Sequence, residues 1–335
     1  MANVSPRGGT VGVIANPAAG KDIRRLVAHA SPTSDAAKMG VVRRAVAGAI
    51  DAGASRILVA PDRHNLSTRA VADFDSSSAR IEIIEEPTIG HPSDTIAMAT
   101  HMRHENVDAL IVLGGDGTHR DVAKGWLDAP MVAISTGTNN VFPRQIDATL
   151  AGIAAGLVAS GIVALSDVSY QAKVAHVTFS DGGTDDLALV DLVLMHGNFT
   201  GSRAVWEPSQ LQVVIACIAE PATIGLSAIA ALLMPVDRRS PRGVYVLLGG
   251  PESVRVPIAP GWFADVPYWS VDEVEIGQPT ELRGPGVLSF DGERDRVLAT
   301  GTTATVRMLA DGPRVIDVEA TIAAAVAAKH FQSGR

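Results

Sequence analysis

A glycine-rich turn at the end of an apolar run is the first place in this sequence where chemistry could occur. Residues 111–125 read IVLGGDGTHRDVAKG, so the turn Gly114–Thr118 joins a strand-like run to a helix-like one. Adjacent glycines let a backbone approach a ligand closely, and the N-terminus of the next helix offers free N–H groups to a phosphate. A carboxylate repels phosphate, so Asp116 has two interpretations: it caps the helix, or it acts beside a phosphate and its cation. The spacing fits neither the dinucleotide fingerprint nor the P-loop.

A second candidate loop follows the apolar run 131–136. Residues 135–142 read STGTNNVF, which places serine, threonine, glycine and two asparagines close together. Such groups can bind phosphate, ribose or the edge of an adenine, although the same residue types also form Asx turns that cap a helix. Two such loops at one sheet edge make a ligand pocket a stronger hypothesis than either loop alone.

The first strand-like run of the chain ends in a loop with local positive charge. Residues 13–25 read VIANPAAGKDIRR: Asn16-Pro17 ends the run, and Gly20-Lys21 opens a segment that contains two arginines. Basic groups at a strand end, within an otherwise acidic protein, suit an anionic ligand. The alternative is the solvated start of a basic helix.

Two carboxylates follow a later apolar run. Residues 288–297 read LSFDGERDRV, with Asp291 and Glu293 separated by one glycine. Such a pair can hold Mg²⁺ or deprotonate a hydroxyl, whereas Asp-Gly on its own indicates a hairpin turn. The histidines and the cysteine do not have the spacing of a zinc site, and the sequence contains no Gly-x-Ser-x-Gly elbow of a serine hydrolase.

The elements that must position these loops alternate between strand and helix over the first 145 residues. The predicted strands are 10–17, 56–62, 80–87, 109–115 and 131–136, and the predicted helices are 34–53, with Ser34 or Asp35 as its cap, 92–106 and 119–129. This alternation is typical of a doubly wound parallel sheet, in which ligands bind beyond the carboxyl ends of the strands. The glycine-rich turn and the 135–140 loop fall at that edge.

After a small-residue helix at 148–161, the pattern changes to short strands separated by turn residues. Residues 171–195 predict a hairpin around an Asp-Gly-Gly-Thr turn, and further short strands follow. We therefore expect three parts: an α/β nucleotide-binding domain over 1–145, an antiparallel β-rich domain over 146–312 with a partly helical insert at 198–241, and a C-terminal segment over 313–335 that packs back on the first domain.

Composition excludes several other classes of protein. The 335 residues carry a net charge of −8, which makes the chain a poor general nucleic-acid binder. The single cysteine, Cys217, excludes an internal disulfide and is expected to be a buried thiol. The apolar tract 211–236 is interrupted by Glu220-Pro221 and falls short of the ~20 residues of a membrane span, so it predicts a buried strand and helix without stable membrane insertion. The N-terminus shows no signal peptide, which predicts a cytoplasmic protein.

An Asn-Pro-x-x-Gly first loop combined with a Gly-Gly-Asp-Gly-Thr turn resembles the NAD kinase and diacylglycerol kinase superfamily. More closely, the chain is similar to the acetoin catabolism protein X branch of ATP-NAD kinase-like proteins. The similar stretches are NPAAGKDIRRLVAHAS, VLGGDGTHRDVAKG, STGTNNVFP, FTGSRAVWEP and LSFDGERDRV. The resemblance implies an N-terminal α/β domain, a C-terminal antiparallel β-sandwich, an active site in the cleft between them, ATP with Mg²⁺, and a homo-oligomer such as a dimer or tetramer.

By this resemblance the candidate catalytic residues are Asp116, Asp291 and Glu293, the last two matching the Asp-Gly-Glu segment at the catalytic centre of lipid kinases. Asp94 and Thr95, with Gly90, resemble the Gly-His-Ala region of those enzymes. The residues implied to bind the nucleotide are Asn16, Pro17, Gly20, Lys21, Asp94, Thr95, Gly114, Gly115, Gly117, Thr118, Ser135, Thr136, Gly137, Thr138, Asn139 and Asn140.

Together these features favour phosphoryl transfer from ATP to a hydroxyl of NAD or a related cofactor or metabolite. Mg²⁺ would bridge the phosphates, and Asp116 would orient the metal or take the acceptor proton, with Glu293 or Asp291 as the rival base. The acceptor half matches less well, because NAD kinases carry an Asn-Glu pair for the acceptor ribose where residues 187–195 read LALVDLVLM. Two alternatives stay open: a lipid or other small-molecule kinase, and a non-catalytic nucleotide sensor associated with acetoin catabolism.

Overall fold

The first domain is built on one sheet in the computed structural model, which describes residues 8–19, 34–75, 77–137, 139–197 and 208–332. Its strands are β1 (Gly9–Ala15), β2 (Ala54–Val59), β3 (Arg80–Ile83), β4 (Ala109–Gly114), β5 (Pro130–Ser135), β6 (Ser169–Gln171) and β17 (Arg314–Ile316). The seven strands follow the order β3-β2-β1-β4-β5-β17-β6, and all neighbours are parallel except β17 and β6. The predicted parallel α/β sheet is confirmed.

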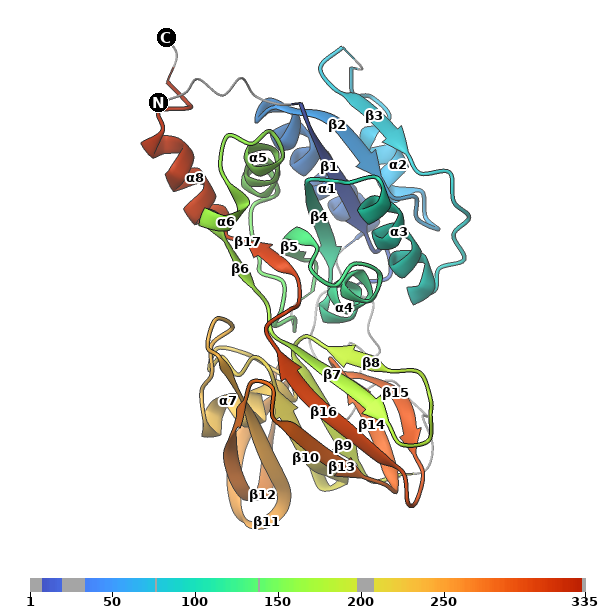
Figure 1. Cartoon of the computed structure of the whole chain (residues 1–335), viewed down its shortest axis with the longest axis vertical. Helices are drawn as coiled ribbons and strands as arrows, with labels where there is room; N and C mark the ends of the chain where they lie inside the picture. Colours follow the sequence, from blue (N-terminus) through green and yellow to red (C-terminus); the bar gives the residue numbers. More distant parts are fainter. Residues whose placement is uncertain (1–7, 20–33, 76, 138, 198–207, 333–335) are drawn as a thin grey trace.

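Helices cover both faces of this sheet (Figure 1). They are α1 (Asp35–Asp51), α2 (Leu66–Val71), α3 (Pro92–His104), α4 (Asp116–Gly125), α5 (Ala148–Ala159) and α6 (Leu165–Val168). Because side chains alternate along a strand, Ile111 and Leu113 of β4 pack in one apolar cluster with α1 and α5, whereas Leu110 and Val112 pack with α3 and α4. Both faces are buried, which is why these strands are continuous apolar runs.

Helix α5 packs with the first domain, although we expected the second domain to begin at residue 146. Its glycines allow backbone contact with α1: a Cβ on Gly152 would lie 1.9 Å from the carbonyl oxygen of Ala45. The two helices share one apolar cluster with the sheet. The chain therefore leaves this domain only after β6, and it returns through β17.

Two antiparallel sheets form the second domain. Their strands are β7 (Val174–Phe179), β8 (Asp186–Ala188), β9 (Asp191–Met195), β10 (Leu211–Ala216), β11 (Arg242–Ala259), β12 (Trp262–Glu275), β13 (Pro279–Arg283), β14 (Gly286–Phe290), β15 (Glu293–Leu298) and β16 (Thr303–Leu309). One sheet has the order β12-β11-β10-β9-β14-β15 and the other β13-β16-β7-β8. The predicted antiparallel C-terminal domain is confirmed.

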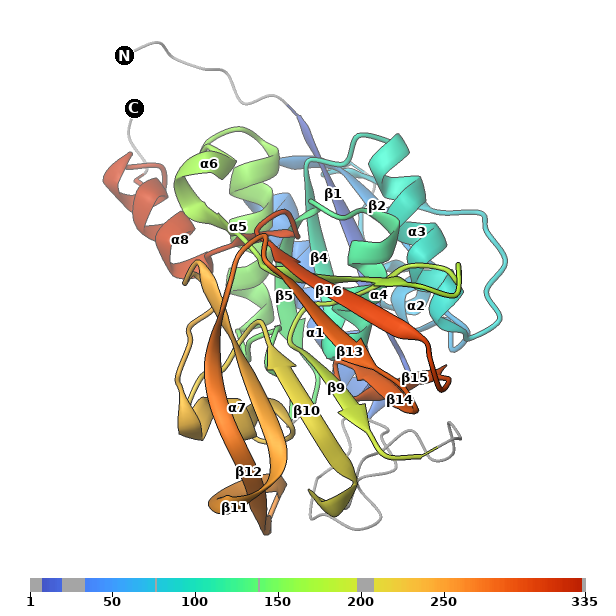
Figure 2. The same ribbon diagram turned by 60° about the horizontal axis from the view of Figure 1, so that its bottom comes forward.

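The hairpin predicted at 171–195 is only partly correct. Strands β7 and β8 pair antiparallel, but the apolar run 187–195 breaks after Ala188, and β9 pairs with β10 and β14 in the other sheet. The tract 211–236 forms β10 and the buried helix α7 (Ser227–Leu233), as predicted. A short 3₁₀ helix, η2 (Pro208–Gln210), precedes β10. Figure 2 shows β11 and β12 as a long hairpin that extends beside α7.

Two further predictions concern the chain as a whole. Cys217 is fully buried, as expected, and burial raises the pKa of its thiol to about 12. Of the helices that the structure describes, none has the length and apolar character needed to cross a membrane. The C-terminal segment adds β17 to the first sheet beside β5, and helix α8 (Val318–Ala327) then packs on α5 (Figure 1).

Candidate active site

A cavity of about 650 Å³ lies at the carboxyl ends of β1 and β4, and residues of both domains line it. These two strands are neighbours in the sheet, and the helices that follow them, α1 and α4, pack on opposite faces. This is the switch point at which doubly wound sheets bind ligands. The first domain contributes the segments that follow β1, β2, β3, β4 and β5, and the second contributes residues 190–191, 224–227, 260 and 291–293.

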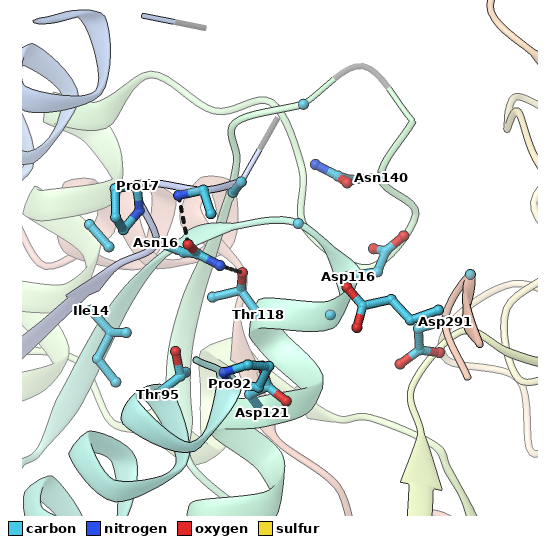
Figure 3. Close-up of a pocket in the computed structure, with 18 of the residues that line it drawn as sticks. Ile14, Asn16, Pro17, Pro92, Thr95, Asp116, Thr118, Asp121, Asn140 and Asp291 are labelled. Carbon is cyan, nitrogen blue, oxygen red and sulfur yellow. Dashed lines mark hydrogen bonds between the residues drawn. The ribbon is translucent and has the colours of Figure 1, made fainter. Parts of the chain in front are cut away.

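Most of the predicted site residues come together at this cavity (Figure 3). Those that line it are Asn16, Pro17, Asp94, Thr95, Gly115, Asp116, Gly117, Thr118, Gly137, Asn139, Asn140, Asp291 and Glu293. Gly114, Ser135 and Thr136 lie behind the lining, at the ends of β4 and β5. Gly20, Lys21 and Thr138 lie outside the described residues.

The glycine turn runs directly into α4, whose N-cap is Gly115. Its glycines are needed for close contacts: a Cβ on Gly114 would lie 2.5 Å from the Thr118 Oγ1, and one on Gly117 would lie 3.2 Å from Glu293 Oε1. The turn therefore brings the N-terminus of α4 against a carboxylate from the second domain. A helix N-terminus at a cavity favours an anionic ligand.

The first loop is tied to this turn from two directions. Asn16 Nδ2 donates to Thr118 Oγ1 at 2.9 Å, and its Oδ1 accepts from the Ala18 backbone at 2.8 Å (Figure 3). Lys38 of α1 is fully buried, and its Nζ donates to the carbonyl oxygens of Pro17 and Ala19 at 2.5 and 2.6 Å. Sequence reasoning missed Lys38, which places a positive charge beneath a loop of the cavity.

Asp116 is the first residue of α4 and does not cap it, so the capping interpretation is wrong. Its carboxylate instead accepts hydrogen bonds from the backbone N–H groups of Val141 and Phe142, at 3.0 and 2.8 Å. Within the same loop, Asn140 Nδ2 donates to Ser135 Oγ at 2.8 Å. Asp116 therefore fixes the 135–142 loop against the glycine turn.

Three other aspartates repeat this arrangement around the cavity. Asp62 accepts from the backbones of His64, Leu66 and Ser67, and Asp94 from those of Ile89, Gly90 and His91. Asp291 accepts from those of Leu189, Val190 and Asp191 at 2.7–3.1 Å. Each of these carboxylates braces a loop, and only Asp62 was missed from the sequence.

Asp291 is buried in a left-handed backbone conformation, with φ at 50°. Burial raises the pKa of its carboxyl to about 6, against the lowering effects of Arg120 and of its three N–H donors. A carboxylate that already accepts from three backbone groups has little capacity left for a ligand. We infer that Asp291 holds the backbone of the turn between β8 and β9 in place.

Glu293 differs from the other candidate carboxylates. It opens β15, is half-buried and lines the cavity, with Oε1 facing Gly117 of α4. In the described part of the chain no group donates a hydrogen bond or forms an ion pair to its carboxylate. Among the three predicted catalytic residues, Glu293 is therefore the one whose oxygen atoms are available to a ligand.

Basic side chains of α4 lock the two domains together beside this site. Arg120 is buried, donates to the Leu187 carbonyl and the Asp186 carboxylate at 2.9 Å each, and stacks over the Phe290 ring. Lys124 also pairs with Asp186, at 2.7 Å. These contacts join α4 to the second domain and so fix the position of Glu293 relative to the glycine turn.

His119 lies beneath the glycine turn and faces away from the cavity. Its Nδ1 contacts the Gly115 carbonyl oxygen at 2.8 Å, and its ring packs against Phe142 at 5.5 Å. Complete burial lowers the pKa of His119 to about 4, so the ring is neutral at pH 7 and Nδ1 carries the proton donated to Gly115. We infer a supporting role for His119 and no proton transfer to a ligand.

Comparisons with known proteins agree with this arrangement. Residues 11–160 match the ATP-NAD kinase N-terminal domain, and residues 173–311 match the acetoin catabolism protein X C-terminal domain. Acetoin catabolism protein X of Cupriavidus necator H16 is 36% identical over 324 residues, which cover 92% of this chain and 90% of that protein. The crystal structure of yeast NADH kinase complexed with NADH has the same fold, with a TM-score of 0.54 at 17% identity over 99% of this chain and 90% of that one. The chain belongs to the acetoin catabolism protein X family.

Proposed function

We propose that this protein is an ATP-dependent small-molecule kinase that transfers a phosphoryl group to a hydroxyl of NAD or of a related cofactor or metabolite. The observation that carries the proposal is the placement of Glu293. An uncommitted carboxylate of the second domain meets the N-terminus of α4, where a phosphate would bind. A phosphate site and a general base within one cleft are the two parts that phosphoryl transfer requires.

The phosphate end of the cavity is formed by the first domain. The N-terminus of α4 and the loop that contains Asn140 would bind the phosphates, while the buried Lys38 adds positive charge beneath the first loop. Four aspartates hold the surrounding loops rigid through backbone N–H groups. Such a preorganised wall orients the γ-phosphate without rearrangement, and orientation supplies much of the rate in phosphoryl transfer.

Glu293 is placed to take the proton of the acceptor. As the acceptor hydroxyl oxygen forms its bond to the γ-phosphorus, the bond from that phosphorus to the ADP oxygen breaks, and the hydroxyl proton passes to Glu293.

The carboxylates also fit a divalent cation that enters with the nucleotide. Mg²⁺ is commonly bound by one or two carboxylates together with substrate phosphates. The residues that the structure describes contain no cluster of three or more metal-ligating side chains, and Glu293 stands next to the phosphate site. Glu293 would hold such an ion as the alternative to acting as the base, and the charge of the ion would offset the repulsion between the phosphates and the acidic wall.

One observation favours an acceptor with an apolar portion. The second-domain wall of the cavity includes Val190, Ile224, Leu226 and Pro260. A lipid-like or otherwise apolar alcohol would suit this wall and is the second candidate acceptor. Flotation with phospholipid vesicles separates the two possibilities, because a kinase for a soluble acceptor should stay off the vesicles.

The proposal is tested with Glu293→Gln and the matched control Glu281→Gln, which changes an exposed glutamate of β13. Wild type and control should convert ATP and one member of an acceptor panel to ADP and a phosphorylated product detected by mass spectrometry. Glu293→Gln should bind ATP but lose at least about 100-fold in turnover, the usual contribution of a general base. Full turnover by Glu293→Gln would refute its role. Nucleotide binding by the wild type with no product from any acceptor would favour the sensor alternative.

A further inference from the structure

A buried arginine of the second domain contacts the 135–142 loop from the side opposite Asp116. Arg238 lies between α7 and β11, and only 9% of the residue is exposed. Its Nη1 and Nη2 donate to the carbonyl oxygens of Phe142 and Val141, both at 2.9 Å. Its Nε and Nη2 donate to the two carboxylate oxygens of Glu220 at 2.9 and 3.1 Å, and Nη1 also reaches the Tyr170 hydroxyl.

These five hydrogen bonds use every N–H group that a guanidinium possesses. This arrangement requires a planar guanidinium. One edge of the group pairs with a carboxylate, while another edge donates to two successive carbonyl groups. A lysine ammonium at the same place could not reach both carbonyls and Glu220 together. The residue type at position 238 is therefore matched to the backbone of one short loop.

The peptide groups of Val141 and Phe142 are held from both domains at once. Their N–H groups donate to Asp116 of α4, and their carbonyl oxygens accept from Arg238. The peptide group between Val141 and Phe142 has its N–H on the carboxylate and its C=O on the guanidinium, so opposite charges polarise this one group in the same sense and each contact strengthens the other. Asn140 and Val141 line the cavity, so any displacement of this segment moves its wall.

Glu220 connects the same guanidinium to the apolar wall of the cavity. It lies within the connection from β10 to α7, which continues into residues 224–227 of the lining. Glu220 also pairs with Arg144 of the first domain at 2.9 Å. A continuous path thus runs from the apolar wall of the cavity along the β10–α7 connection to Glu220, and through Arg238 to the loop that Asp116 fixes beside the glycine turn.

We propose that Arg238 is a positioning residue that couples the β10–α7 connection of the second domain to the loop beside the phosphate site. Occupation of the acceptor wall and binding of nucleotide then favour the same placement of Val141 and Phe142, and each ligand strengthens the binding of the other. The identity of these ligands rests on the proposed function. The mechanical link through Val141 and Phe142 does not.

Arg239 provides a matched control one residue away. It is exposed, pairs with Asp317 at 2.6 Å and lies over the Tyr170 ring. The experiment compares Arg238→Met, Arg238→Lys and Arg239→Met in the full chain. Amide hydrogen exchange reports on the peptide that contains Val141 and Phe142, and calorimetry with Mg·ATP reports on the nucleotide site.

Both Arg238 variants should speed exchange in the 139–143 peptide by about fivefold or more, the factor expected for one lost hydrogen bond. They should weaken Mg·ATP binding by about tenfold, a coupling in the usual range between sites. Arg239→Met should do neither. Arg238→Lys keeps a charge next to Glu220 and so decides the question if Arg238→Met does not fold. Unchanged exchange in a folded Arg238 variant would overturn the inference. If the wild type binds no nucleotide, the proposed function fails, and the exchange data alone decide the role of Arg238.

Discussion

Replacing His119 by asparagine should change how the stability of the protein depends on pH. The ring is completely buried, and burial lowers its pKa from 6.5 to about 4. Asparagine does not ionise in this range, while its amide nitrogen can still donate to the Gly115 carbonyl in place of Nδ1. The variant therefore removes one titrating group from beneath the glycine turn.

The sign follows from proton counting. Between pH 6.5 and 4 the unfolded chain binds a proton at His119 that the folded chain excludes, so acid favours unfolding. A tenfold change in proton affinity is worth about 1.4 kcal/mol, so this group costs the wild type about 3 kcal/mol once the pH is below both values. Between pH 8 and pH 4.5 the loss is about 2–3 kcal/mol. Above pH 6.5 His119 is neutral in both states, and the protein has its full stability with respect to this group.

Asp291 works in the opposite direction. Its pKa is raised from 3.8 to about 6, so in that window the folded protein holds a proton that the unfolded chain releases, and acid favours folding. Comparison of the wild type with a variant that keeps Asp291 cancels this contribution. Taking the change between two pH values for each protein also cancels the pH-independent packing that asparagine loses against Phe142.

Urea unfolding of wild type, His119→Asn and the control His104→Asn, at pH 8 and pH 4.5, measures the difference. His104 is exposed at the end of α3. The wild type should lose about 2–3 kcal/mol more than His119→Asn on acidification. His104→Asn should follow the wild type. If the curves for wild type and His119→Asn run parallel between these pH values, the burial argument for His119 is refuted.

Three further outcomes follow from contacts in the structure. Asp291→Ala should lower the free energy of unfolding by about 2–4 kcal/mol, because three N–H groups at 189–191 lose a buried charged acceptor. Urea unfolding at pH 7.5 measures this loss, and a value below about 1 kcal/mol would contradict the bracing role. Lys38→Met should cost about 1–3 kcal/mol and weaken Mg·ATP binding in calorimetry, since the carbonyls of Pro17 and Ala19 lose their donor; unchanged binding would separate Lys38 from the nucleotide site. Gly152→Ala should destabilise the protein by about 1–3 kcal/mol, because the added Cβ clashes with α1. Gly40→Ala, where a Cβ meets only the Arg44 guanidinium at 3.5 Å, should stabilise it by about 0.5–1 kcal/mol. If thermal unfolding shifts both variants alike, the packing argument is ruled out.

The parallel sheet could be predicted because its strands carry their own signal. Ile111 and Leu113 face one helical layer and Leu110 the other, so burial on both sides leaves a continuous apolar run that can be read locally. The gathering of loops at one edge follows from the parallel topology. The division of residues 187–195 between two sheets could not be predicted, because Asp291, about 100 residues later, binds the backbone at the break.

The roles of individual carboxylates depended on distant partners in the same way. Asp116 looked like a helix cap or a group beside a metal ion, and its hydrogen bonds go to Val141 and Phe142 in another loop. Lys38 and Arg238 gave no local signal at all, since a basic residue in a helix or a turn is ordinarily solvated. Their burial follows from carbonyl groups that only the folded chain presents to them.

The return of the chain through β17 has a consequence for the order in which the protein can be completed. In the finished sheet β17 lies between β5 and β6. Strand β6 therefore joins the sheet only by pairing with β17, a strand from late in the sequence. During synthesis the Pro130–Met131 end of the β5 edge must therefore stay uncovered until the whole β-sandwich has emerged, while Arg144 already pairs with Ala133 and Ser135. The sandwich behaves as an insertion within the first domain, and a chain shortened before Arg314 would leave the Pro130–Met131 end of β5 as an open, aggregation-prone edge.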